Sequence, residues 1–116
     1  MKFIQKKTNK FGAKRTTCAY GHNHPSKGEA AHCVVLHLIM KSEGSDILSI
    51  DYETPYRLEV NGVLVCKHVP DWTLKMYGGR KKIVEFKGMP TPAWKLKMAL
   101  FKAIYPDIEY EVVYRK

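Results

Sequence analysis

The sequence has 116 residues, which is enough for one domain and leaves no room for two independent cores. Hydrophobic residues make up 45% and charged residues 27%, a composition typical of a globular domain and not of a disordered chain. The formal net charge of +9 predicts a polyanionic partner, which would be DNA, RNA or an acidic membrane surface.

Hydropathy and cysteine usage argue against a membrane-spanning protein and against a secreted, disulfide-bonded one. No uninterrupted apolar run is longer than residues 33–36, which is far short of the roughly 20 residues of a membrane span. The basic residues 1–15 are not followed by the apolar stretch of a signal peptide. Three cysteines are an odd number and make a poor disulfide framework. We therefore expect a soluble, intracellular protein with reduced thiols.

Residues 1–17 are predicted to form a basic arm, and residues 18–116 a single domain. The arm lacks acidic residues, and its basic residues are Lys2, Lys6, Lys7, Lys10, Lys14 and Arg15. One interpretation is a solvated tail. Another, compatible with the first, is an arm that becomes ordered on the phosphates of a nucleic acid.

The first helix is predicted to begin after Ser26, which forms a capping box with Glu29. Residues 30–40 are apolar on nearly every face, which predicts a mostly buried helix, and Gly44 ends it. Extended segments are expected at residues 47–50, 56–60, 63–65, 72–77 and 82–87, with hairpin turns at Asn61-Gly62 and Gly78-Gly79.

A second helix is predicted from Pro92 to Tyr105, with Thr91 as its N-cap and Pro106 directly after it. A last strand is expected at residues 108–114. With the extended stretch from residue 47 to residue 60 counted once, the predicted order of elements is α-β-β-β-β-α-β.

Two carboxylates and a lysine are expected to converge on the second hairpin. Glu85 and Lys87 lie two apart on one strand, so they share a face of the sheet, and antiparallel pairing brings Asp71 near Glu85. Two carboxylates can hold Mg²⁺ for phosphodiester hydrolysis, and a lysine can orient the attacking water or the phosphate. The alternative interpretation is a salt bridge between Glu85 and Lys87, with Asp71 as a turn residue.

Pro70-Asp71 and Glu85-Phe86-Lys87 resemble the two motifs of the PD-(D/E)xK nuclease superfamily. That resemblance implies an α/β fold with a restriction-endonuclease-like αβββαβ core, in which two helices flank a central mixed sheet. More closely, the chain resembles a small phage-encoded family of unassigned function within that superfamily. The segments that carry this resemblance are the two motifs and residues 10–14, 26–30, 91–97 and 100–103.

The resemblance implies a DNA endonuclease that depends on Mg²⁺ or Mn²⁺ and works in the cytoplasm of a bacterial host, with no membrane partner. Its relatives include phage endonuclease I and archaeal Holliday-junction resolvases, which cut branched DNA as dimers, so a homodimer is expected. The aromatic residues exceed what a small core hides and favour a dimer surface; they are Tyr56, Trp72, Tyr77, Trp94 and Tyr105. The alternative is a monomer that buries these rings.

By the same resemblance, Asp71 and Glu85 bind the metal and Lys87 positions or activates water. Glu29 matches a third carboxylate of the metal site, although it also completes the capping box. Lys95 matches a basic residue of the second helix, whose alternative is a solvated lysine. The residues expected to hold phosphates are Lys10, Lys14, Arg15, Lys95, Lys97 and Lys102. The rival functions are a non-catalytic nucleic-acid-binding phage protein and a protein-binding scaffold.

Cysteine and histidine side chains crowd the entrance to the first helix. They are Cys18, His22, His24 and Cys33, in the spacing C-x3-H-x-H-x8-C, and two sulfurs with two imidazoles suit tetrahedral Zn²⁺. The alternative is that Cys33 is a buried helix cysteine while the two histidines belong to a loop near DNA or the catalytic metal. We interpret four further residues as structural: Cys66, His32, His37 and His68. His68 lies near Asp71, however, and could touch the site there.

Overall fold

The computed structural model describes residues 15–115 and divides the chain into two units, Met1–Leu36 and His37–Lys116. Each unit is described by itself below. Most of the expected basic arm, including Lys10 and Lys14, lies outside the described residues.

The first unit contains a short antiparallel ladder between β1 (Thr16–Thr17) and β2 (Asn23–His24). Their connection is a tight turn, in which the amide of Cys18 donates to the carbonyl of His22 and the amide of Gly21 donates to the carbonyl of Cys18. Gly21 has a φ of 82°, a left-handed conformation that glycine adopts without a steric cost. The turn therefore brings the two ends of a histidine- and cysteine-containing loop together.

Helix α1 (Lys27–Lys41) begins in the first unit and ends in the second. Its predicted N-cap is confirmed, because the amide of Glu29 donates to Oγ of Ser26 over 3.1 Å. The prediction of a mostly buried helix is wrong. Val35, Leu38 and Ile39 are 44%, 58% and 47% exposed, so the apolar residues extend beyond the side of the helix that is covered.

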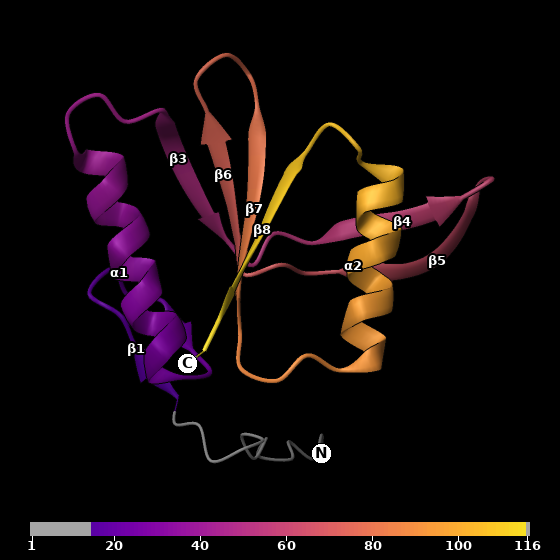
Figure 1. The fold of residues 1–116 in the computed structure, drawn as a ribbon, viewed down its shortest axis with the longest axis horizontal. Coiled ribbons are helices and arrows are strands. Elements are labelled where there is room, and N and C mark those ends of the chain that lie inside the picture. Colours follow the sequence, from indigo (N-terminus) through magenta and orange to yellow (C-terminus); the bar gives the residue numbers. More distant parts are fainter. Residues whose placement is uncertain (1–14, 116) are drawn as a thin grey trace, which may run out of the picture. The chain divides into compact units, whose positions relative to one another are not determined.

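The second unit is built on a four-stranded mixed sheet in the order β3-β6-β7-β8 (Figure 1). The strands are β3 (Ile47–Tyr52), β6 (Trp72–Met76), β7 (Lys81–Lys87) and β8 (Glu109–Tyr114). The β3–β6 and β6–β7 pairs are antiparallel, whereas β7 and β8 are parallel. The expected α/β class, with a mixed sheet and two helices, is confirmed.

Both predicted hairpins form, although only one belongs to this sheet. Strands β6 and β7 are joined through Gly78 and Gly79, whose φ angles are 86° and 79°. Strands β4 (Tyr56–Val60) and β5 (Val63–His68) form a separate two-stranded sheet. Asn61 and Gly62, with φ angles of 51° and 80°, supply the two left-handed positions that a type I′ turn requires.

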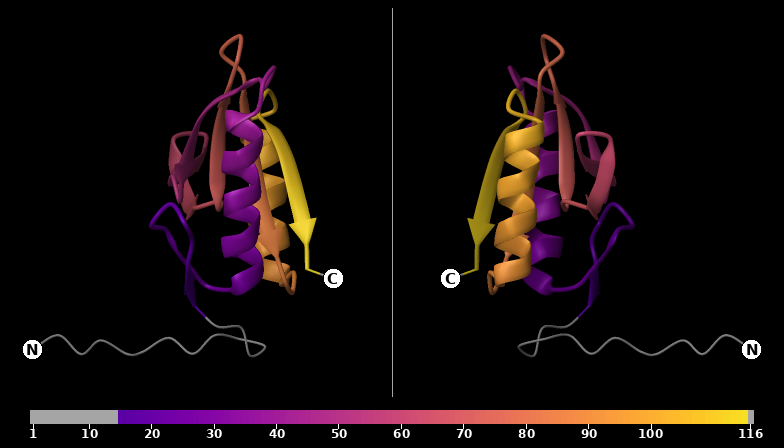
Figure 2. Two further views of the ribbon diagram at one scale, coloured as in Figure 1. Left: turned by 90° about the vertical axis from the view of Figure 1, so that its left-hand side faces the viewer. Right: turned by 90° about the vertical axis from the view of Figure 1, so that its right-hand side faces the viewer.

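Helix α2 (Pro92–Ile104) makes the crossover that joins the parallel strands β7 and β8. Oγ1 of Thr91 accepts a hydrogen bond from the amide of Trp94 over 3.1 Å, which confirms the predicted N-cap. The chain ascends in α2 and returns in the opposite direction in β8 (Figure 2). This crossover places the first turn of α2 after the end of β7 that carries Glu85 and Lys87.

The core of the second unit joins the sheet, the separate hairpin and α2. Phe101 from α2 is fully buried with Leu58 from β4 and Ile83 from β7. Trp72 and Trp94 are also buried, at 0% and 8% exposure, so these two rings do not supply the dimer surface that the sequence suggested. Within the described part of the chain, neither helix has the length and apolar character that crossing a membrane would require.

Candidate functional site

A pocket of about 370 Å³ in the second unit brings together three of the predicted catalytic residues, Asp71, Glu85 and Lys87. Its other lining residues are Lys67, His68, Val69, Thr91, Ala93, Trp94 and Lys97. As the hairpin register predicted, Asp71 and Glu85 therefore face the same space. Lys97 lines the pocket where the sequence favoured Lys95, which is exposed and is not among the lining residues.

Asp71 directly precedes β6 and is fixed against the neighbouring strand. Its Oδ2 accepts a 2.8 Å hydrogen bond from the backbone amide of Phe86, which lies between Glu85 and Lys87 on β7. The bond anchors one carboxylate oxygen and sets how the side chain enters the pocket.

Glu85 is 3% exposed, and a carboxylate this deeply buried needs hydrogen-bond donors. Its Oε2 accepts a 2.6 Å bond from Nε1 of Trp94 and a 2.9 Å bond from the hydroxyl of Tyr110. The donors come from α2 and β8, so the crossover that follows β7 supplies the groups that hold the Glu85 carboxylate in place.

His68 extends this network from the end of β5. Its Nε2 lies 2.8 Å from the hydroxyl of Tyr110 and 3.7 Å from Oε1 of Glu85. Burial, reinforced by the positive charges of Lys97 and Lys87, lowers the pKa of His68 to about 4. His68 is therefore neutral at pH 7. The hydroxyl hydrogen of Tyr110 is already used in the hydrogen bond to Glu85, so the Tyr110 oxygen can only accept from His68. The neutral His68 ring therefore carries its hydrogen on Nε2 and donates it in this bond.

Tyr110 keeps its proton over the whole physiological range. Burial raises the pKa of its hydroxyl, and the negative charges of Glu85 and Asp71 raise it further. The hydroxyl is thus a permanent hydrogen-bond donor to the carboxylate of Glu85.

Lysines give the pocket its surplus of positive charge. Nζ of Lys87 lies 4.8 Å from the centroid of the Trp94 ring, a cation–π contact that holds the ammonium beside the donor to Glu85. Lys67 and Lys97 also line the pocket, so three ammonium groups accompany two carboxylates. This balance suits a ligand that carries negative charge.

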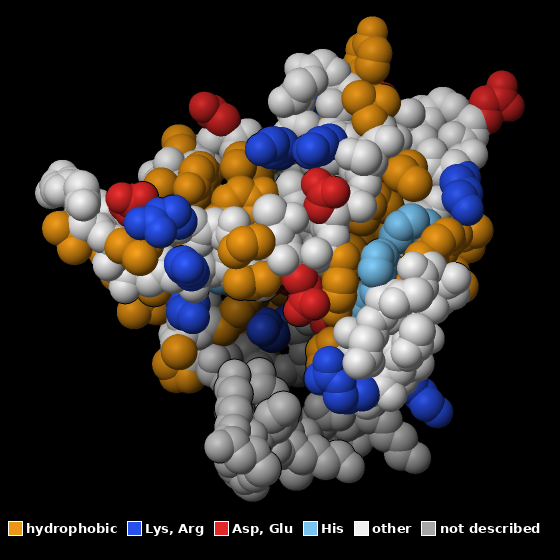
Figure 3. Space-filling view, turned by 180° about the vertical axis from the view of Figure 1, so that it is seen from behind, with side chains coloured by type: hydrophobic (Ala, Val, Ile, Leu, Met, Phe, Trp, Pro, Cys, Tyr) orange, Lys and Arg blue, Asp and Glu red, His pale blue; other side chains and the backbone are white. Residues whose placement is uncertain are grey.

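Lys102, which was also expected to hold phosphates, does not line this pocket. Arg15 and Lys102 are exposed, and Nζ of Lys102 lies 5.5 Å from the centroid of the Tyr110 ring. On the face drawn in Figure 3, lysine and arginine side chains are spread among acidic ones. Most of the net positive charge belongs to residues outside the described range, which are rich in lysine and contain no acidic residue.

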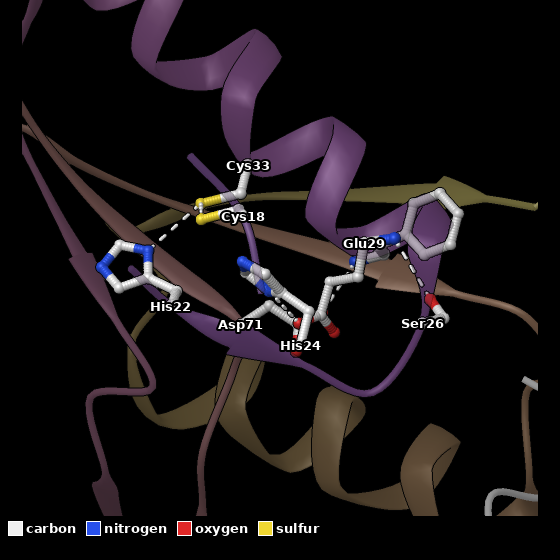
Figure 4. Close-up of polar contacts among 8 residues, drawn as sticks. Cys18, His22, His24, Ser26, Glu29, Cys33 and Asp71 are labelled. Atoms are coloured by element: carbon white, nitrogen blue, oxygen red, sulfur yellow. Dashed lines mark hydrogen bonds and ion pairs between the residues drawn. The ribbon is translucent and has the colours of Figure 1, made fainter. Parts of the chain in front are cut away.

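The first unit brings together the predicted cysteine and histidine cluster of Cys18, His22, His24 and Cys33, which could bind a metal such as zinc. One ligand atom from each residue lies within 4.8 Å of the others. The two sulfur atoms are 3.8 Å apart, and Nδ1 of His22 lies 3.3 Å from the sulfur of Cys33 (Figure 4).

Glu29 contacts this cluster within the first unit. Its Oε2 lies 2.5 Å from Nδ1 of His24, and both side chains are buried. The carboxylate thus has a partner besides the capping interaction made by the backbone amide of the same residue.

Hydrogen bonds also affect the nearby thiol of Cys18. Burial favours the neutral thiol, but hydrogen bonds with the Tyr20 and His22 backbone and with the His24 and Cys33 side chains outweigh it, so the pKa of Cys18 is lowered. A lowered pKa favours the thiolate, which is the form that binds metals.

Comparisons with known proteins place the chain in a family without assigning its activity. No curated protein and no solved structure matches the chain. A family model described as "Protein of unknown function (DUF1064)" matches residues 8–116, which include both the pocket and the cysteine and histidine cluster. The chain therefore belongs to the DUF1064 family.

Proposed function

We propose that this protein is a metal-dependent nuclease that hydrolyses phosphodiester bonds in DNA at the pocket of the second unit. The observation that carries the proposal is that Asp71, Glu85 and Lys87 line one pocket. Two carboxylates beside an ammonium are the groups that metal-assisted phosphodiester hydrolysis requires.

The order of elements in the chain supports the same proposal. Helix α1, strands β3, β6 and β7, helix α2 and strand β8 follow one another as α-β-β-β-α-β, with the hairpin β4–β5 inserted after β3. This is the order that the resemblance to PD-(D/E)xK nucleases implies. In the proposed fold, Asp71 opens the second strand of that core, and Glu85 and Lys87 lie on the third.

The donor set of the pocket fits a hard divalent cation, which prefers carboxylate oxygens and keeps several waters. Asp71 and Glu85 would hold Mg²⁺ or Mn²⁺ through carboxylate oxygens, because both side chains line the pocket and hydrogen bonds fix the orientation of each carboxylate. When bound, such a cation stabilises the negative charge that builds on the phosphate during hydrolysis. Glu29 is not assigned to this site, since its Oε2 contacts His24.

The other residues of the pocket would position the substrate and the carboxylates. The ammonium of Lys87 would orient the attacking water or the scissile phosphate, and Lys67 and Lys97 would bind neighbouring phosphate oxygens. Trp94 and Tyr110 would keep Oε2 of Glu85 directed away from solvent. The lysine-rich residues 1–15 would bind phosphates outside the pocket.

The test is a cleavage assay with Mg²⁺ or Mn²⁺ on four-way junction, flap, nicked, single-stranded and linear duplex DNA. We expect cleavage of at least one substrate, and we expect Lys87→Ala to abolish it while DNA binding is retained. Lys81→Ala is the matched control, because Lys81 lies on the same strand, is exposed and does not line the pocket. DNA binding without cleavage by the wild-type protein would favour a non-catalytic nucleic-acid-binding protein. Failure to bind any nucleic acid would favour a protein-binding scaffold.

A further inference from the structure

The first unit contains a group of buried side chains that the proposed nuclease chemistry does not use. Within residues 15–36, the buried side chains are those of Cys18, His24, Glu29, Ala30, Cys33 and Leu36. Only Ala30 and Leu36 are ordinary apolar core residues. So short a segment with so little apolar surface generally needs a disulfide or a metal to hold its structure.

The sulfur atoms have the spacing of metal ligands and not of a disulfide. Cys18 and Cys33 are free cysteines whose sulfurs are 3.8 Å apart, whereas a disulfide bond is about 2.05 Å long. Two sulfurs, each about 2.3 Å from a tetrahedral zinc ion, are separated by about 3.8 Å. The observed separation therefore equals one edge of a zinc tetrahedron.

The two histidines are placed to complete the tetrahedron. Nδ1 of His22 lies 3.3 Å from the sulfur of Cys33, close to the sulfur–nitrogen edge of about 3.6 Å that tetrahedral zinc produces. Nδ1 of His24 contacts Oε2 of Glu29, so a metal would be held through Nε2 of this ring. The ring nitrogen of a metal-binding histidine that does not hold the metal commonly donates an N–H hydrogen bond to a carboxylate. This bond fixes the orientation and tautomer of the ring.

We propose that Cys18, His22, His24 and Cys33 bind one structural zinc ion, and that Glu29 is a positioning residue which orients His24. Two thiolates and two imidazoles form a closed tetrahedral set, with no position left for a substrate. The ion would fasten the β1–β2 turn to α1, because Cys18 and the two histidines come from the turn and strand β2, and Cys33 comes from the helix.

Metal content is the first measurement. Full-length protein, purified without a polyhistidine tag or chelator under reducing conditions, is expected to contain about one zinc per chain, and chelation is expected to lower its Tm. Replacement by Co²⁺ is expected to give the intense visible absorption of a tetrahedral site with thiolate ligands. Protein that contains no zinc and takes up neither ion, or that forms a Cys18–Cys33 disulfide, would overturn the proposal.

Matched variants locate the ion. Cys33→Ala is expected to lose the zinc, and Cys66→Ala, which removes the third cysteine, is expected to keep it. Zinc that survives Cys33→Ala, or that is lost in Cys66→Ala, would contradict the assignment. Since the readout is metal content, absence of nuclease activity would leave the result unaffected.

Glu29→Gln tests the positioning role. The variant removes the negative charge that the His24 ring contacts, and we expect zinc affinity to fall about 10- to 100-fold. Glu43→Gln is the control, because Glu43 is an exposed carboxylate. If Glu29→Gln binds zinc as tightly as the control, Glu29 does not position His24. Competition with a chelator of known zinc affinity measures the difference without any assay of catalysis.

Discussion

Nε1 of Trp94 donates a 2.6 Å hydrogen bond to Oε2 of Glu85, and this bond ties the first turn of α2 to strand β7. The contact explains how a buried carboxylate is tolerated in the interior of the second unit. The Trp94 ring therefore has two contacts in the pocket: its face contacts the Lys87 ammonium, and its N–H orients the Glu85 carboxylate.

Trp94→Phe keeps an aromatic ring beside Lys87 but removes the N–H donor to Glu85. Loss of a partner to a buried charged group costs about 1–3 kcal/mol, so we expect the free energy of unfolding to fall by about that amount. We also expect weaker Mg²⁺ or Mn²⁺ binding, because the carboxylate loses one of its fixed donors. Denaturant unfolding and metal titration check both effects. Trp72→Phe is the control, since Trp72 is buried but does not line the pocket.

Much of the second unit could be predicted from local signals in the sequence. The Asn61-Gly62 turn, the capping residue Thr91 and the alternation in the strands each act over a few residues, so they are readable without knowledge of the tertiary structure. The hairpin register likewise placed Asp71 beside Glu85.

The donors to Glu85 could not be predicted in the same way. Tyr110 reaches the pocket because β8 pairs in parallel with β7, and no local pattern reveals that pairing. The sequence placed His68 near Asp71 and Lys97 among the phosphate-binding residues, but it did not show that the separate hairpin and α2 bring both into one pocket with Glu85. The sequence suggested two roles for Glu29, as a metal ligand and as part of the capping box. Its contact with His24 indicates a third role, which neither motif predicted.

Asp71→Asn and Glu85→Gln each remove one negative charge from the pocket while keeping the shape of the side chain. We expect DNA cleavage to fall by orders of magnitude and DNA binding to be largely retained, because the metal is held by these charges and the DNA by lysines. Glu59→Gln, an exposed carboxylate on β4, is expected to cut like the wild type. Normal cleavage by either pocket variant would show that the metal-site assignment is wrong.

The pH dependence of stability should report the burial of His68. Its pKa is about 4 in the folded protein and about 6.5 in the unfolded chain, so only the unfolded chain takes up this proton between those values. Its contribution to stability is thus fully present above pH 6.5 and is lost as the pH falls toward 4. His68→Gln should make the free energy of unfolding less sensitive to pH in this window. Parallel pH profiles for the two proteins would refute the assignment.

Assembly is a separate expectation, carried by the resemblance to junction-cutting nucleases. Two-strand cleavage of a branched junction needs two active sites related by a two-fold axis, which a homodimer supplies. Sedimentation at micromolar concentration, with and without four-way junction DNA, is expected to show the dimer. A monomer under both conditions would instead favour a nuclease that nicks one strand at a time.

The basic residues 1–15 should control how DNA binding responds to salt. Their removal deletes Lys2, Lys6, Lys7, Lys10, Lys14 and Arg15 and no acidic residue. Because each neutralised phosphate releases counterions, log affinity falls with log salt by about 0.9 per phosphate contact in duplex DNA. The truncated protein should therefore show a flatter slope than the full chain, measured by fluorescence anisotropy over a salt series. Lys97→Ala removes a single pocket cation and should change the slope by about one contact at most. A slope unchanged by the truncation would mean that the arm is a solvated tail and that the phosphate contacts lie within the folded domain.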